Sequence, residues 1–458
     1  MKFNLKKFII IVCWLILWHL VYLIVNNNLI IEGPINTAKA LISILGESKF
    51  WYAVANSSVK ILMGFFFGCL FGFFLASISH NNRLFGDFLN PAISLSKSVP
   101  VASFVILALI ITGSSYLSVL ISFIIVFPQT YTAILSGYDN IDMKMTEFAQ
   151  VYRIPRLYKF MALYLPALTP FILSSFKVSL GMAWKSGIAA EVIGVAKNSI
   201  GEKLYMAKIY LLTDELFANT IVIILLSILT EKILMTTLIP FLSSKRIFNG
   251  NYHKKNTVLF KSSSLKLMNI CKSFDERKVL ENISLQINPS DVICIMGESG
   301  SGKSTLLRII AGLLKADKGD FITEMNISPG IVFQDGRIFE ELNPIQNIRL
   351  ISDKSENEII CHLRQLLDEK SLKLPVSNLS GGMKRRVCIC MAIISKSNIL
   401  VFDEPFSALD SVNKSKTVDY INKYKGERAV VMTSHQQEDA ELLSATIYRL
   451  NSDGLYRV

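Results

Sequence analysis

The chain has 458 residues, of which 51% are hydrophobic and 18% are charged. Nearly all the long apolar runs lie before residue 242, whereas residues 264–458 alternate polar and apolar positions as a soluble domain does, so the composition excludes a single soluble domain. The net charge of +12 forms no basic stripe interleaved with aromatic residues, and much of it lies beside apolar segments, which favours a membrane partner over nucleic acid.

Six apolar segments within residues 1–242 predict membrane spans, because about 20 apolar residues cross a bilayer. The expected spans are 8–25, 60–79, 98–113, 116–135, 170–192 and 219–240. The first apolar run is long and no small-residue cleavage site follows it, so we expect a retained span rather than a signal peptide. The sequence therefore predicts an all-α transmembrane bundle of about six spans over residues 1–242.

Basic residues predict the orientation of this bundle, because short cytoplasmic loops accumulate Lys and Arg. With the N-terminus inside, the loops on that side carry Lys2, Lys6, Lys7, Arg83, Lys144, Arg153, Arg156, Lys159, Lys245, Arg246, Lys254 and Lys255. An even number of spans returns the chain to the same side. We expect a multi-pass protein of a prokaryotic cytoplasmic membrane, with its N-terminus and soluble part in the cytoplasm.

The fifth span carries three ionisable residues, Lys177, Lys185 and Glu191. At 100° per residue they fall within an arc of about 120°, which predicts one polar face on this helix. Charged groups at membrane depth usually face the bundle interior or a water-filled path. Snorkelling side chains or a structural Lys/Glu pair are equally good explanations, and a path lined by the two lysines would favour an anionic solute.

After a basic linker over residues 243–263, residues 264–458 predict an α/β domain with a helical subdomain. Alternating residues over 265–287 indicate hairpin strands, and 291–296 is a short buried strand that leads into "GESGSGKST". Strand, glycine-rich loop and helix form the context of a phosphate-binding loop. Its residues are Gly297, Glu298, Ser299, Gly300, Ser301, Gly302, Lys303, Ser304 and Thr305.

The chemistry of this loop is the binding of a nucleotide phosphate. Successive backbone N–H groups and the helix N-terminus attract the phosphate, Lys303 reaches the β and γ oxygens, and the Ser304 hydroxyl binds Mg²⁺. A second buried strand ends in Asp403 and Glu404. There one carboxylate can hold Mg²⁺ while the next orients the attacking water as a general base.

The stretch "NLSGGMKRR", over residues 378–386, distinguishes this nucleotide site from others. With it, residues 264–458 resemble the ATP-binding domains of ABC transporters, in which Ser380, Gly381 and Gly382 would contact the γ-phosphate held by the opposite subunit. The resemblance also implies a role for Phe274 in stacking on adenine, for Gln334 in linking Mg²⁺ and water to the helical subdomain, and for Asp410 in the loop after the catalytic strand. It implies that His435 touches the γ-phosphate, and that ATP and Mg²⁺ are the ligands.

A polar stretch over residues 146–168 resembles the "EAA" loop of ABC importer permeases, a short cytoplasmic helix that docks on the ATPase. Glu147, Ala149, Leu163, Leu165 and Pro166 match its spacing. Phe148 and Arg153 depart from it, because the family has Ala and Gly there. Taken alone, the stretch also fits an ordinary amphipathic connector.

The stretch "AWKSGIAAEVIG", at the end of the fifth span, resembles a segment of permeases of the nitrate, sulfonate and taurine class. The resemblance implies ATP-driven import of a small anion or a vitamin precursor, delivered by a separate solute-binding protein. It also implies a dimer with a second copy of the chain or a related half-transporter.

Two other functions fit the order of the domains. Exporters usually have a permease followed by an ATPase, although their membrane domains are longer and lack an EAA-like loop. The third possibility is a membrane-anchored ATPase that works mechanically on a partner protein and moves no solute.

Overall fold

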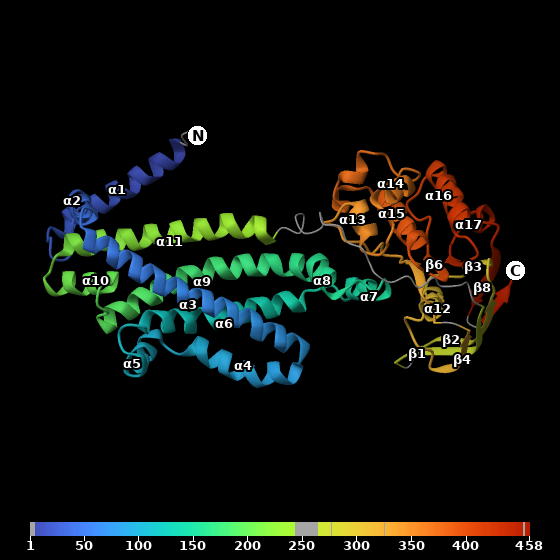
Figure 1. The fold of residues 1–458 in the computed structure, drawn as a ribbon, viewed down its shortest axis with the longest axis horizontal. Helices are drawn as coiled ribbons and strands as arrows, with labels where there is room; N and C mark the ends of the chain where they lie inside the picture. The colour runs from blue at the N-terminus through green and yellow to red at the C-terminus, as the bar shows by residue number, and fades with distance from the viewer. Residues whose placement is uncertain (1–4, 243–263, 276, 325, 452–453) are drawn as a thin grey trace. The chain divides into compact units, whose positions relative to one another are not determined.

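The computed structural model describes residues 5–242, 264–275, 277–324, 326–451 and 454–458. By contact, the chain divides into two compact units, drawn in Figure 1. The helical unit comprises Met1–Asn140 and Ala167–Ser243, and the α/β unit comprises Ile141–Pro166 and Ser244–Val458. The linker predicted over residues 243–263 lies outside the described residues.

The helical unit contains both long apolar helices and shorter ones. They are α1 (Leu5–Val25), α2 (Pro34–Leu45), α3 (Ser48–Asn81), α4 (Arg83–Ser98), α5 (Val101–Thr112), α6 (Leu117–Asp139), α9 (Leu165–Gly194), α10 (Ile200–Ile209) and α11 (Thr213–Leu242). Among the described residues, 5 helices are long and apolar enough to cross a membrane, and a bent pair of helices raises the number to 6 if it counts as one span. The predicted all-α bundle of about six spans is confirmed at this level.

The third predicted span, over 98–113, differs from the structure. Its residues form α5, whose 12 residues extend only about 18 Å, short of a hydrocarbon core of about 30 Å. The chain bends by 105° between α4 and α5. Val99 and Pro100 cause the bend, since both are extended at this point and a residue before proline is disfavoured in the helical region.

Helices α3 and α6 approach closely because glycines line the contact. A Cβ atom on Gly64 would lie 2.4 Å from the backbone oxygen of Val119, and one on Gly68 would lie 2.8 Å from Cβ of Val126. Glycines four residues apart on one helix face allow this approach of two backbones in a membrane. The two helices therefore pack with their main chains in near contact.

The three ionisable residues of α9 do not share one environment. Lys177 and Lys185 are exposed in the single chain, and Lys177 Nζ lies 3.6 Å from Glu231 Oε1 on α11. Glu191 is fully buried, where Ser57 Oγ donates to its Oε2 at 2.7 Å and the Gly201 amide donates at 3.3 Å. The difference arises because α3 and α10 cover the glutamate but not the lysines.

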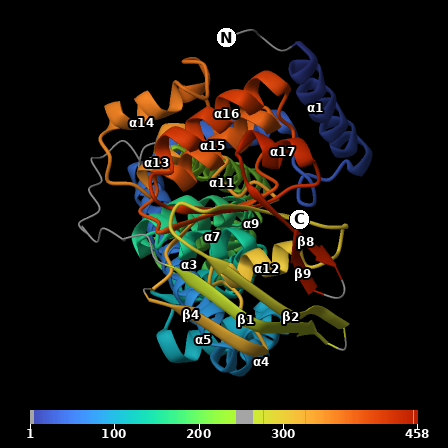
Figure 2. The same cartoon turned by 90° about the vertical axis from the view of Figure 1, so that its right-hand side faces the viewer.

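The α/β unit contains two sheets. Strands β2 (Arg277–Ile287), β1 (Leu265–Phe274) and β4 (Lys318–Thr323) form an antiparallel sheet in that order, seen together in Figure 2. The second sheet has the order β5 (Pro329–Val332), β6 (Ile399–Asp403), β7 (Ala429–Thr433), β3 (Val292–Met296), β8 (Thr446–Asn451) and β9 (Gly454–Arg457). All its pairs are parallel except β8 with β9.

Within the described residues, six α-helices that follow the linker in the chain accompany these sheets. They are α12 (Lys303–Ile310), α13 (Pro344–Arg349), α14 (Glu356–Leu363), α15 (Gly381–Ile394), α16 (Ser411–Tyr424) and α17 (Gln437–Leu442). The predicted α/β domain with a helical subdomain is confirmed. The carboxyl ends of β3, β6 and β7, which are neighbours in the sheet, lead directly into the predicted site residues.

The segment over residues 141–166 belongs to the α/β unit by packing. It forms α7 (Met143–Val151), α8 (Arg156–Lys159) and a π-helical turn over Phe160–Tyr164. Phe148, Ala149, Tyr152 and Ile154 are buried in the same hydrophobic cluster as the two sheets. This stretch of the predicted transmembrane domain is therefore part of the core of the α/β unit.

Candidate functional site

The loop between β3 and α12 has the backbone of a phosphate-binding loop. Gly300 and Gly302 have φ angles of 82° and 96°, in the left-handed region that glycine adopts without strain. A Cβ atom on Gly302 would also lie 2.9 Å from the backbone oxygen of Val279. Glycine is therefore required at this position for both reasons, immediately before the helix begins at Lys303.

The Lys303 ammonium group lies inside this loop. It donates to the backbone oxygens of Gly297 at 2.8 Å and of Glu298 at 2.7 Å. Burial lowers the pKa of Lys303, although the nearby carboxylates of Glu404 and Asp403 oppose that effect. Among the residues that the structure describes, the buried hydroxyl of Ser301 has no hydrogen-bond partner. An ammonium group and an unused hydroxyl turned into a glycine loop fit an oxyanion such as a phosphate group.

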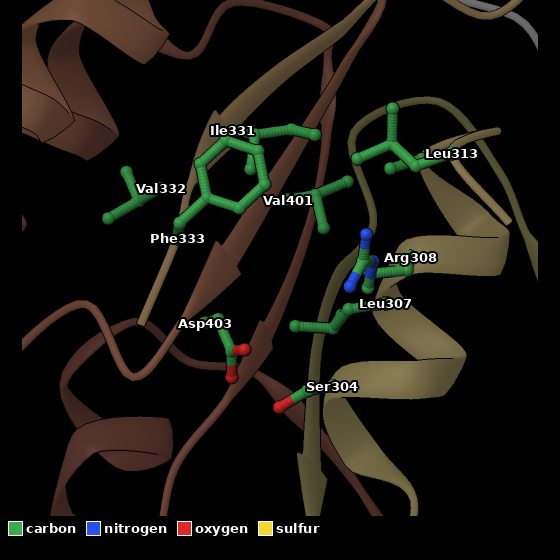
Figure 3. Close-up of a pocket in the computed structure, with 10 residues that line it drawn as sticks. Ser304, Leu307, Arg308, Leu313, Ile331, Val332, Phe333, Val401 and Asp403 are labelled. Carbon is green, nitrogen blue, oxygen red and sulfur yellow. The ribbon is translucent and has the colours of Figure 1, made fainter. Parts of the chain in front are cut away.

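Ser304 and Asp403 line one end of a pocket whose other walls are mainly apolar, and their oxygen atoms face each other in Figure 3. Ser304 is the second residue of α12, and Asp403 ends β6. The hydroxyl of Thr433, at the end of β7, donates to Asp403 Oδ1 at 2.7 Å and so fixes the carboxylate. A hydroxyl and an oriented carboxylate are oxygen donors of the kind that Mg²⁺ prefers.

Two predicted site residues from distant parts of the sequence, Gln334 and His435, meet at the predicted Glu404. Its Oε1 atom lies 3.3 Å from Gln334 Nε2 and 3.2 Å from His435 Nε2. The Glu404 amide donates to the Thr433 hydroxyl at 3.1 Å, and its φ angle of 52° is unusual for a residue with a side chain. The carboxylate is thus held by two side chains that the sequence analysis had assigned to the same site.

Arg385 is a site residue that the sequence analysis missed. It is only 5% exposed, and its guanidinium donates to the backbone oxygens of Asp403, Glu404, Phe333 and Gln334. One side chain on α15 therefore connects the end of β6 to the segment that carries Gln334. The available signal was the pair of arginines, Arg385 and Arg386, shortly after Ser-Gly-Gly. Two successive residues of a helix point in different directions, so one of the pair faces the core when the helix packs against it.

The Ser-Gly-Gly stretch lies apart from the phosphate loop of its own chain. Ser380 caps α15 by accepting from the Met383 amide at 3.3 Å, and a Cβ atom on Gly381 would meet open space. Asp410 caps α16 by accepting from the Asn413 amide at 2.8 Å. Within the described ranges, no hydrogen bond or ion pair joins residues 380–382 to residues 297–305.

The remaining predicted ligand contacts are exposed. The Phe274 ring, at the end of β1, is 47% exposed, and the Lys272 ammonium group lies 5.5 Å from its centre. Glu298, Ser299 and Gly300 are exposed at the tip of the loop, and Thr305 is half-buried. An exposed aromatic ring at a strand end is available for stacking on a planar ligand.

Glu147 on α7 is held by two arginines of the α/β unit. Arg337 Nη1 lies 2.6 Å from Glu147 Oε2, and Arg308 of α12 pairs with Oε1. Burial alone would raise the pKa of Glu147, but the hydrogen bonds and charges of Arg337 and Arg308 lower it below its usual value. Lys144 also pairs with Asp335 at 3.1 Å. These pairs join α7 to the helix that begins at Lys303 and to the residues just after Gln334.

Two family models match the chain, one in each part. "ABC transporter" matches residues 280–407, and "Binding-protein-dependent transport system inner membrane component" matches residues 68–243. The second match includes the whole segment 141–166.

Curated relatives are import or transport ATP-binding proteins. The chain is 32% identical over 211 residues to the spermidine/putrescine import ATP-binding protein PotA of Thermotoga maritima, covering 42% of this chain and 57% of the relative. It thus spans little more than half the length of that protein. It is 33% identical over 196 residues to the ergothioneine transport ATP-binding protein EgtV of Helicobacter pylori, covering 38% of this chain and 92% of the relative. It is 32% identical over 178 residues to the zinc import ATP-binding protein ZnuC of Vibrio parahaemolyticus, covering 38% of this chain and 68% of the relative.

Proposed function

The chain belongs to the ABC transporter family, as a permease domain joined to an ATP-binding domain, and from this premise we propose that it couples ATP hydrolysis to import of a small solute across a prokaryotic cytoplasmic membrane. The observation that carries the proposal is the position of residues 141–166. This segment lies within the permease match and packs into the core of the α/β unit. The site of hydrolysis is thereby connected through the chain to the spans on either side of the segment.

In the proposed hydrolysis, Glu404 is the general base. Its carboxylate takes a proton from water as the water oxygen attacks the γ-phosphorus, and the bond to the leaving ADP oxygen breaks to give phosphate. Gln334 and His435 orient the carboxylate through their contacts of 3.3 and 3.2 Å. Lys303 neutralises charge on the phosphate oxygens, and Phe274 stacks on adenine.

Mg²⁺, when bound, would neutralise charge on the β- and γ-phosphates. Ser304, Asp403 and Gln334 are the residues that would hold it, the first two directly or through water.

We place each complete ATP site between two subunits. Ser380, Gly381 and Gly382 are separate from the loop of their own chain, and the open space beside Gly381 leaves room for a ligand held by a partner. A two-fold dimer with a second copy or a related half-transporter would bring this stretch onto the partner's phosphate loop, next to its own Asp410 loop. An isolated monomer that hydrolyses ATP at the full rate would contradict this arrangement.

Coupling follows from the contacts of α7. Closure of the dimer around ATP would displace Gln334 and the phosphate-loop helix, and Glu147 is paired with arginines next to both. The segment 141–166 would then move with them and reorient α6 and α9, between which it lies in the chain. Hydrolysis and phosphate release would reverse the motion.

Import is distinguished from export and from a mechanical role by the requirement for a solute-binding protein. We would reconstitute the chain in liposomes and measure ATP hydrolysis with and without the solute-binding protein encoded nearest to it. Stimulation by the loaded binding protein is expected for import. Stimulation by solute alone would indicate an exporter, and the absence of both would favour mechanical work on another protein.

The class of solute is proposed from the membrane spans, because the relatives named above are named for chemically unlike solutes. Lys177 and Lys185 of α9 are both exposed, and among the described residues Lys177 pairs with Glu231 whereas Lys185 has no ion pair. A cation at membrane depth is unfavourable against lipid and is usually placed on a water-filled path. We therefore favour a small solute with an anionic group, such as a sulfonate, taurine or nitrate, with a vitamin precursor as the alternative. Mass spectrometry of the ligand that co-purifies with the binding protein would test this.

A further inference from the structure

Strand β5 lies at one edge of the six-stranded sheet and leads to Gln334. Among the described strands it pairs with β6 alone, and Ile331 is opposite Val401 in that pairing. Residues along a parallel strand alternately direct their N–H and C=O groups to either side. The two groups of Ile331 point to the free edge of β5, where a buried site offers them no water. They need a partner, because an unsatisfied buried backbone group is costly.

A single hydroxyl from the permease segment satisfies both groups. The Tyr152 hydroxyl donates to the Ile331 oxygen at 2.8 Å and accepts from the Ile331 amide at 3.1 Å. Tyr152 is only 6% exposed, and burial raises its pKa, so the phenol keeps the proton that it donates. The side chain thus takes the place of a neighbouring strand at this position of the sheet.

The ring of Tyr152 is fixed independently of the hydroxyl. Its centre lies 4.9 Å from that of Phe148 on α7, and the Phe148 ring meets Phe339 of the α/β unit edge-on at 5.6 Å. Aromatic contacts of this kind hold the ring without any polar atom. Removal of the hydroxyl alone therefore leaves the packing of the segment in place.

The end of β5 is also tied to the end of β6, which leads to the catalytic Glu404, through Arg385 of α15. Gln334 follows Ile331 by three residues, and Arg385 binds the backbone oxygens of Phe333 and Gln334 together with those of Asp403 and Glu404. Tyr152 acts on the opposite, outer edge of β5. The backbone before Gln334 therefore contacts Tyr152 of the permease segment on one edge and Arg385 of the hydrolytic site on the other.

We propose that Tyr152 is a positioning residue for Gln334. Through the main chain of β5, Tyr152 transmits displacement of the permease segment to the hydrolytic site. This inference rests on the proposed function, because it gives a path for coupling in a transporter that hydrolyses ATP. It differs from the ion pairs of Glu147, since a neutral hydroxyl carries it and salt does not screen it.

The test is Tyr152→Phe in the full-length protein in liposomes. We expect kcat for ATP hydrolysis to fall about tenfold, as unsatisfied buried groups let the strand end shift, with KM for ATP unchanged because the phosphate loop is untouched. Solute transported per ATP should fall as well. Hydrogen exchange followed by mass spectrometry should show faster exchange of the peptide that contains the Ile331 amide.

Tyr420→Phe is the matched control. Tyr420 is 2% exposed, and its hydroxyl contacts His362 Nδ1 at 2.9 Å and Cys390 Sγ at 3.4 Å, in the same unit but away from β5. We expect it to lower the melting temperature comparably while leaving kcat and exchange at Ile331 unchanged. Equal loss of kcat in both variants would reduce Tyr152 to a structural residue and overturn the inference.

The inference and the proposed function fail in different ways. An active wild-type protein with an unchanged Tyr152→Phe variant would overturn the role of Tyr152 alone. A well-folded wild-type protein that neither hydrolyses ATP nor transports solute with its binding protein would overturn both. If Tyr152→Phe did not fold, its ring packing would be insufficient without the hydroxyl, and the separation of packing from positioning argued above would be wrong.

Discussion

The phosphate loop and the segment 141–166 meet the same backbone requirement with different residues. Gly300 and Gly302 occupy the left-handed region in the loop, with φ angles of 82° and 96°, whereas Arg153 occupies it between α7 and α8, with a φ angle of 49°. Glycine lets a ligand approach the main chain, but it forms no side-chain contacts. The loop is thus built for a ligand, and the segment is built to dock on protein by its side chains, at the expense of local strain.

The largest effect on activity is expected beside the phosphate loop, at Glu404. Glu404→Gln should lower kcat for ATP hydrolysis about 10²- to 10⁴-fold, because an amide cannot accept the proton of the attacking water. Binding of ATP, measured by fluorescence titration, should be unchanged, since the phosphate loop keeps its backbone. Activity near that of the wild type would remove Glu404 from the role of general base.

Arg385→Ala tests whether a side chain that hydrogen-bonds to main-chain oxygens can control the site. It removes a donor from four backbone oxygens, of which that of Glu404 keeps donors from Ser407 and that of Phe333 keeps the Gly336 amide, and the free energy of unfolding should fall by about 3 kcal/mol. Arg428→Ala is the control, because Arg428 also donates to backbone oxygens, those of Lys425, Ile393 and Tyr424. Both should lower the denaturation midpoint, but only Arg385→Ala should also lower kcat. Equal kcat values would limit Arg385 to stability.

Glu147→Gln tests the docking of the segment. The glutamate side chain is 24% exposed, so we expect a coupling free energy with Arg337 of about 1 kcal/mol in a double-mutant cycle on unfolding. Because the folded pKa of Glu147 is lowered, this stability is present above the unfolded pKa and is lost as pH falls through the folded pKa. The Gln variant should lose that pH dependence, and transport per ATP should decrease. A coupling free energy of zero would show that the pair contributes nothing to docking.

The smallest effect concerns Arg153. Arg153→Gly and Arg153→Ala both remove the side chain and its contacts, so the difference between them reports the backbone alone. The Gly variant should be more stable than the Ala variant by about 1 kcal/mol, because alanine is strained in the left-handed region. Equal melting temperatures would show that the turn relaxes to another conformation.

The sequence predicted those parts of the site that local patterns encode. The loop over 297–305, the strand before Glu404 and the strand before His435 each combine a short apolar run with a polar terminus, so their positions followed without the fold. Arg385 and Tyr152 were missed because their partners, Glu404 and Ile331, are far away in sequence. For Tyr152, the available signal was its spacing of four residues from the aromatic Phe148.

The membrane spans show the same limit. Hydropathy located the apolar segments but not the bend of 105° between α4 and α5. It could not separate the environments of Lys185 and Glu191 either, since helical periodicity gives the direction of a side chain but not what covers it. Tertiary contacts with α3 and α10 decide that difference.

The close contact of α3 with α6 restricts how this bundle can evolve. A methyl group added at Gly68 would collide with the side chain of Val126, 2.8 Å away, so the first position can enlarge only if the second shrinks at the same time. Gly64 is stricter, because its obstacle is a main-chain oxygen that no substitution removes. Among homologues we therefore expect Gly64 to be invariant and Gly68 to vary only in concert with residue 126.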